Sequence, residues 1–120
     1  MTCAEIIERL DTLEFNQFDM EQKLRWIHQL DGQIYREVIE RHEGAPDMPP
    51  LYISGNEKPM IQEPYGEQIY TSYLLAQMAL YYGEGARYNS QAAAFDRAYI
   101  AWSADYTRRH MPRGAKQFIF

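Results

Sequence analysis

The stretch that decides the fold is residues 83–112, which read GEGARYNSQAAAFDRAYIAWSADYTRRHMP. Large aromatic residues recur in it at spacings of three and four, and alanines recur at the same spacings on a neighbouring line. The pattern predicts one long helix that another helix approaches along the alanines, while the aromatic rings supply buried area. We expect Phe95 and Tyr99 to lie in the core. The two strips are Phe95, Tyr99, Trp102 and Tyr106, and Ala94, Ala98 and Ala101.

Three shorter helices are predicted before this one. Thr2 and Glu5 form a capping-box pattern at the start of the first helix. Asp19 is a second N-cap candidate, and it opens a helix from about Met20 to Arg41. A third helix runs from about 65 to 82, where glycines end it and a short loop folds the last helix back antiparallel. The expected apolar faces are Ile6, Ile7, Leu10 and Leu13; Leu24, Ile27, Leu30, Ile34, Val38 and Ile39; and Ile69, Tyr73, Leu74, Gln77, Leu80 and Tyr81.

Two segments lie outside the helical pattern. Residues 43–64 hold five of the six prolines, so no helix continues through them. Within this stretch LYIS and PMIQ flank GNEK, which predicts a short hairpin or an extended arm over 49–64. The last eight residues, RGAKQFIF at 113–120, are predicted to form an extended tail or edge strand. We expect one all-α domain over 1–120, a small antiparallel bundle of about four helices.

Composition and charge narrow the class of protein. A net charge of −5 argues against a general nucleic-acid binder, whose affinity rests on cations that neutralise phosphates. Cys3 is the only cysteine, which excludes an intrachain disulfide and a four-cysteine zinc site and fits a reducing cytoplasm. Glu5 and Glu8 interrupt any signal-peptide pattern, and the most apolar window, YLLAQMALYY at 73–82, is too short to span a bilayer. These features predict a cytoplasmic protein.

Motifs that carry chemistry are missing from the sequence. It contains no P-loop, no dinucleotide-binding glycine pattern, no zinc-protease motif and no nucleophile elbow. The histidines lack cysteine partners and metal-ligand spacing, and the acids of the first helix follow a three-residue spacing typical of a solvated face. We therefore expect no enzyme, no catalytic residue, no cofactor and no metal. The histidines are His28, His42 and His110, and the acids of the first helix are Glu5, Glu8, Asp11 and Glu14.

Charge is distributed unevenly along the chain. Residues 1–22 carry six acidic side chains against Arg9, a net charge of −5, and residues 87–120 carry six basic side chains against two acids, a net charge of +4. Helix dipoles explain part of this asymmetry, because acids favour helix starts and bases favour helix ends. They do not explain Arg113 and Lys116, which follow the last helix. An acidic start and a basic end also suit head-to-tail contacts between copies, which close into rings when the rotation permits.

Three segments of the sequence resemble one family. They read FNQFDMEQKLRWIHQLDGQIYREV at 15–38, EPYGEQIYTSYLLAQ at 63–77 and ARYNSQAAAFDRAYIAWSADYTRRHMP at 86–112. Together they are similar to small phage and prophage proteins that are found beside capsid genes and described as head–tail connector, or adaptor, proteins. The resemblance extends from about Ala4 to Pro112, and none of the matching positions is catalytic.

The resemblance implies a structural role. It implies an all-helical subunit that assembles with copies of itself as a ring below the portal, extends the DNA channel and docks the tail. Such a protein would occur in the host cytoplasm and then in the virion neck, with no membrane contact and no specific nucleic-acid binding. Two alternatives stay open: a helical DNA-binding or regulatory protein that uses RRHMPRGAK at 108–116 on phosphates, and a helical partner-binding module unrelated to phage.

A candidate assembly interface follows from the arm, the basic end and the tail. The proline-rich arm is expected to expose apolar side chains, and the tail is apolar where a frayed end is ordinarily polar. Both segments could fold back over the bundle, or they could reach neighbouring copies or the portal and become ordered on contact. The candidate residues are Leu51, Tyr52, Ile53, Met60, Ile61, Arg108, Arg109, Arg113, Lys116, Phe118 and Phe120.

Overall fold

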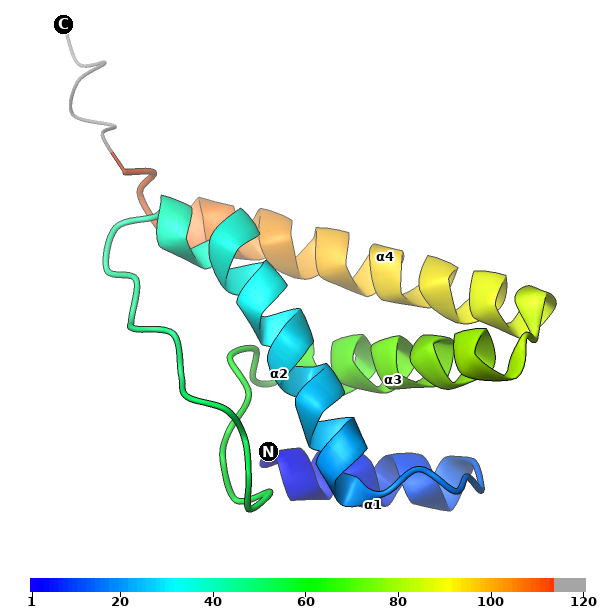
Figure 1. Cartoon of the computed structure of the whole chain (residues 1–120). Coiled ribbons are helices and arrows are strands. Elements are labelled where there is room, and N and C mark those ends of the chain that lie inside the picture. The colour runs from blue at the N-terminus through cyan, green and yellow to red at the C-terminus, as the bar shows by residue number, and fades with distance from the viewer. Residues whose placement is uncertain (114–120) are drawn as a thin grey trace, which may run out of the picture.

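The computed structural model describes residues 1–113 and contains four α-helices and one short 3₁₀ helix in that part of the chain (Figure 1). Between residues 1 and 113 there is no strand, only an isolated antiparallel bridge between His42 and Pro112. The predicted all-α class is confirmed. Most of the predicted tail, residues 114–120, lies outside the described residues. The elements are α1 (Cys3–Leu13), α2 (Met20–Glu37), η1 (Ile39–Arg41), α3 (Gly66–Tyr82) and α4 (Gly85–Arg109).

Both predicted N-caps are present. The Glu5 backbone N–H donates to the Thr2 hydroxyl at 3.2 Å, and the Glu5 carboxylate accepts the Thr2 backbone N–H at 3.0 Å, which completes the capping box of α1. The Asp19 carboxylate accepts the Gln22 backbone N–H at 2.8 Å at the start of α2. The end of α2 differs from the prediction, because Val38 leaves the helical conformation at φ −127° and ψ −60° and the next turn is 3₁₀.

The last two helices form an antiparallel hairpin. Gly83 takes the left-handed conformation at φ 73° and ends α3, as the glycine pattern predicts. Figure 1 shows α3 and α4 side by side, with α2 crossing over them and α1 lying along the opposite edge of α3. The four helices therefore form a small bundle in which α1 and α2 cover the hairpin of α3 and α4.

The core lies where α1 and α2 meet α3. Every predicted apolar position of α2 is buried, and so are Ile6, Ile7 and Leu10 of α1. The predicted face of α3 is wrong in part, because Leu80 and Tyr81 are exposed while Tyr70 and Met78, which lie outside the predicted face, are buried. Apolar residues occur on every side of α3, so their spacing does not select the face that packs.

In α4 the fully buried residues are Ala98 and Trp102. Phe95 and Tyr99 are half-buried and pack against the edge of the core, which corrects the prediction that they lie inside it. The Phe95 ring lies 5.6 Å from the Tyr73 ring of α3. The reason is geometric: α4 packs mainly on α3, so one flank of its aromatic strip faces solvent.

Gly66 marks a close approach between the arm and α3. A Cβ atom at this position would lie 2.4 Å from the Ile61 carbonyl oxygen, which is inside van der Waals contact. The Gly66 backbone N–H also donates to the Gln62 carbonyl at 3.1 Å. A residue with a side chain would force the arm away from the helix start, so glycine stands here in place of a stronger helix former.

Candidate assembly surface

The arm is held on the bundle by the buried carboxylate of Asp31, which is 0% exposed. The Tyr52 hydroxyl donates to this carboxylate at 2.6 Å and the Met60 backbone N–H donates at 3.1 Å. The Tyr70 hydroxyl of α3 donates to the other carboxylate oxygen, and it accepts the Ile61 backbone N–H at 3.0 Å. One side chain of α2 thus joins two points of the arm to α3.

The electrostatics of this cluster follow from burial. Desolvation raises the pKa of the Asp31 carboxyl above its usual value of 3.8, although the hydroxyls of Tyr52 and Tyr70 and the Met60 N–H favour the charged form. Burial and the neighbouring Asp31 also raise the pKa of both tyrosines. The donors and acceptors satisfy one another, so the cluster is suited to anchoring the arm rather than to acid–base chemistry.

The tip of the arm is a turn held by a side chain, not a hairpin. The Glu57 carboxylate accepts the backbone N–H groups of Ile53, Ser54 and Gly55 at 2.7, 3.1 and 2.8 Å. These donors lower the pKa of Glu57 to about 2. The tip is also tied to α1, because the Ala4 N–H donates to the Gly55 carbonyl at 2.8 Å. The hairpin alternative is wrong, and the extended-arm alternative is correct.

The structure divides the five candidate residues of the arm into two groups. Tyr52 and Ile61 are buried against the bundle, at 4% and 2% exposed, and Met60 is half-buried. The expectation that Tyr52 and Ile61 are exposed is therefore wrong, because Asp31 and Tyr70 bind the backbone and hydroxyl groups around them. Leu51 and Ile53 do point outward, at 53% and 80% exposed.

A cluster of aromatic rings lies where the α1–α2 loop meets the end of α3, and in it Tyr81 and Tyr82 are exposed while Phe18 and Trp26 are half-buried. The Phe18 ring lies 5.1 Å from the rings of Trp26 and Tyr81 and 5.5 Å from that of Tyr82. Phe15, in the same loop, is 89% exposed. Rings that contact one another and still face water are typical of surfaces that bind another chain.

The exposed residues of the arm extend this aromatic cluster. Leu51, Ile53 and Met20 line one hollow beside the start of α2, and Phe18, Trp26 and Tyr81 line a second. Glu21 and Arg25 border both hollows, so the two groups flank the first turns of α2. We call this region the apolar surface, and it consists of Phe15, Phe18, Met20, Trp26, Leu51, Ile53, Tyr81 and Tyr82.

The basic candidates lie at the end of α4 and after it, and they form contacts with other residues of the same chain. Arg108 and Arg109 are exposed, and both contact the Asp105 carboxylate, at 3.4 and 3.2 Å. The Arg113 backbone N–H donates to the Arg41 carbonyl at 2.9 Å. The remaining candidates, Lys116, Phe118 and Phe120, lie outside the described residues.

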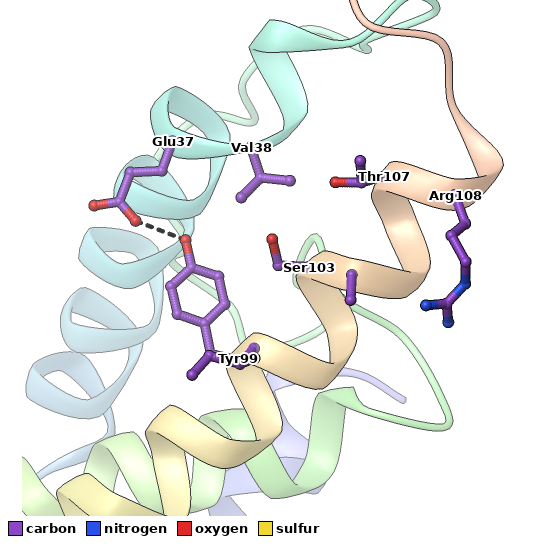
Figure 2. A pocket seen from close by; sticks show the side chains of 8 residues that line it. Glu37, Val38, Tyr99, Ser103, Thr107 and Arg108 are labelled. Carbon is purple, nitrogen blue, oxygen red and sulfur yellow. Dashed lines mark hydrogen bonds between the residues drawn. The ribbon is translucent and has the colours of Figure 1, made fainter.

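A groove separates the end of α2 from the second half of α4 (Figure 2). Its volume is about 690 Å³, and Val38, Ile100 and Ala104 supply its apolar lining. The Tyr99 hydroxyl crosses one end and donates to the Glu37 carboxylate at 2.7 Å. Burial and Glu37 raise the pKa of this tyrosine. The bond joins α4 to the end of α2.

Sequence reasoning missed Asp31 as a site residue, although its position carries a signal. Asp31 lies four residues after Ile27 and three before Ile34, so it falls on the apolar stripe of α2. A carboxylate in such a stripe must find buried donors. Within residues 1–113 no group of three or more histidine, cysteine or carboxylate side chains is placed to hold a metal. No helix in the same region is long and apolar enough to cross a membrane.

Comparisons of this chain with protein-family models, curated proteins and solved structures find no match.

Proposed function

We propose that this chain is a structural protein of phage or prophage necks, similar to head–tail connectors, and that copies of it form a ring below the portal. The observation that carries the proposal is the apolar surface, where large side chains such as Phe15 and Ile53 face water in the single subunit. Large exposed apolar side chains grouped on both sides of the first turns of α2 are typical of sites that bind other proteins. An assembly subunit needs such a surface.

The charge of the chain supports the same role. A net charge of −5 suits a subunit that lines a channel, because a negative wall lets duplex DNA pass without binding it. The alternative of a DNA-binding regulator is weaker, since Arg108 and Arg109 share the Asp105 carboxylate. The partners proposed are therefore further copies of the chain, the portal and the tail, with no sequence-specific DNA contact.

The direct test is cryo-electron microscopy of particles produced by the phage or prophage that encodes the chain. We expect a ring of this subunit between the portal and the tail. In parallel, the affinity of the purified chain for duplex DNA at physiological salt should be no better than ~10⁻⁴ M. Particles without the chain would contradict the connector. Sequence-specific binding at nanomolar concentration would favour the regulator, and absence from particles without DNA binding would favour a partner-binding module unrelated to phage.

A further inference from the structure

The groove between α2 and α4 is apolar and open in the described part of the chain. Ile100 is 68% exposed and Ala104 is exposed, while Val38 beside them is only 6% exposed. Covering Ile100 and Ala104 with an apolar segment would remove apolar surface from water, which is favourable. We propose that residues 114–120 of the same chain occupy this groove, with Phe118 and Phe120 against Val38, Ile100 and Ala104. This proposal is independent of the connector role.

The path of the chain after α4 leads back toward the groove. The Glu43 N–H donates to the Met111 carbonyl at 2.7 Å, and the Arg113 N–H donates to the Arg41 carbonyl at 2.9 Å. This pairing is antiparallel. Each step from Met111 to Arg113 therefore moves back along the chain from 43 to 41, in the direction of Val38. In Figure 2 the segment that follows Arg108 continues beyond the end of the groove at which Thr107 and Arg108 lie.

The distances are within reach of the segment. Phe118 lies five residues after Arg113, and an extended chain spans ~3.3–3.6 Å per residue, so about 17 Å is available. Val38 lies three residues before Arg41, which is ~6 Å at the rise of a 3₁₀ turn. Val38 and Ile100 line the same groove, so Phe118 can reach this groove without displacing Arg113.

The composition of the segment matches the groove. Residues 114–120 read GAKQFIF, so two small residues precede one cation, one glutamine and three consecutive apolar residues. The cation, Lys116, complements the Glu37 carboxylate at the end of the groove. A tether this short gives an effective concentration in the millimolar range, which favours the chain's own segment over that of a second copy.

Disulfide trapping tests the proposal on the full chain. The double variant Ile100→Cys with Phe118→Cys would be equilibrated in a glutathione redox buffer and analysed by non-reducing gel electrophoresis and peptide mapping. Native Cys3 can stay, because it is fully buried and burial raises the pKa of its thiol to about 12. The matched control is Ala101→Cys with Phe118→Cys, which moves the partner by one residue to an exposed position outside the groove lining.

We expect a disulfide at monomer mass, formed at least about tenfold more readily in the Ile100 pair than in the Ala101 pair, consistent with a tethered contact. Adding Ala104→Glu to the Ile100 pair should lower this yield, because it places a charge in the groove. Circular dichroism establishes that each variant keeps its helices. Equal yields in both pairs, or no effect of Ala104→Glu, would overturn the proposal. A disulfide found mainly at dimer mass would overturn it in favour of a second copy.

Discussion

At the scale of single residues, Asp31 determines where the arm lies. Its carboxylate accepts hydrogen bonds from Tyr52 and Met60 of the arm and from Tyr70 of α3 together. A buried carboxylate without donors would cost several kcal/mol, so the donors and the acceptor depend on one another. The arm is therefore a specifically attached part of the domain, although its proline content alone suggests a free loop.

Replacement of Asp31 should loosen the arm. Asp31→Ala leaves two tyrosine hydroxyls and one backbone N–H without their acceptor, and we expect the free energy of unfolding to fall by about 3 kcal/mol. Urea denaturation measures this change. Asp31→Glu offers a control that retains the charge but not the geometry. A loss below ~1 kcal/mol for Asp31→Ala would mean that the cluster does not anchor the arm.

The same carboxyl predicts a pH dependence. Because its pKa is raised in the folded chain, the folded state keeps the Asp31 proton at pH values where the unfolded chain has released it. Its contribution to stability is thus complete below pH 3.8 and is lost as pH rises through the folded pKa. We expect the stability of the native chain relative to Asp31→Asn to fall from pH 3.5 upward, measured by urea unfolding at a series of pH values. Parallel pH profiles would contradict a raised pKa.

Cys3 provides a third prediction at this scale. The thiol is fully buried, and burial raises its pKa to about 12, so little thiolate forms at neutral pH. We expect a thiol reagent such as dithionitrobenzoate to react with the native chain at least about a hundredfold more slowly than with the urea-unfolded chain. The Glu57 carbonyl of the arm tip accepts a hydrogen bond from the Cys3 N–H. Rapid reaction of the native chain would mean that the arm tip and α1 separate frequently.

At the scale of elements, the aromatic residues of α4 differ in how far they are buried. Trp102 is buried and Phe95 is half-buried, so the two rings should differ in their contribution. Trp102→Ala should cost ~3–5 kcal/mol and Phe95→Ala about half as much, by the area that each ring withdraws from water. Urea midpoints of the two variants provide the comparison. Equal costs would mean that α4 is rotated relative to the arrangement described here.

The helices could be predicted from the sequence because their signals are local. The capping pairs at Thr2 and Asp19 and the apolar stripe of α2 each depend on residues within a few turns. The face of α3 and the path of the arm could not, since they depend on contacts between distant residues, such as Asp31 with Tyr70. The candidate surface was predicted only in part: Leu51 and Ile53 are exposed, while the aromatic residues around Phe18 gather only through the tertiary fold.

At the scale of the whole molecule, part of the charge asymmetry is satisfied inside the chain. Glu14, the residue after α1, pairs with Arg87 of α4, and Arg9 pairs with Glu67 at 2.8 Å. Exposed ion pairs contribute little individually and are screened by salt. Contacts between copies should therefore depend more on the apolar surface than on the attraction between an acidic start and a basic end.

This ranking gives a prediction for assembly. The double variant Leu51→Asp with Ile53→Asp places two charges on the apolar surface, at positions that are mostly exposed in the single subunit. Its melting temperature and circular dichroism should stay close to those of the native chain, while its incorporation into phage necks should be lost because each charge would be desolvated at the contact. Quantitative mass spectrometry of purified particles measures incorporation.

The matched control is Met111→Asp, which charges a residue of comparable exposure, at 52%, near the end of α4. It lies outside the apolar surface, so particles should retain it. Loss of both variants from particles would mean that charge anywhere on the subunit prevents assembly, and retention of both would remove the apolar surface from the contact. Raising the salt concentration should weaken assembly of the native chain less than the two substitutions weaken it. Salt screens exposed charges but leaves apolar contacts in place.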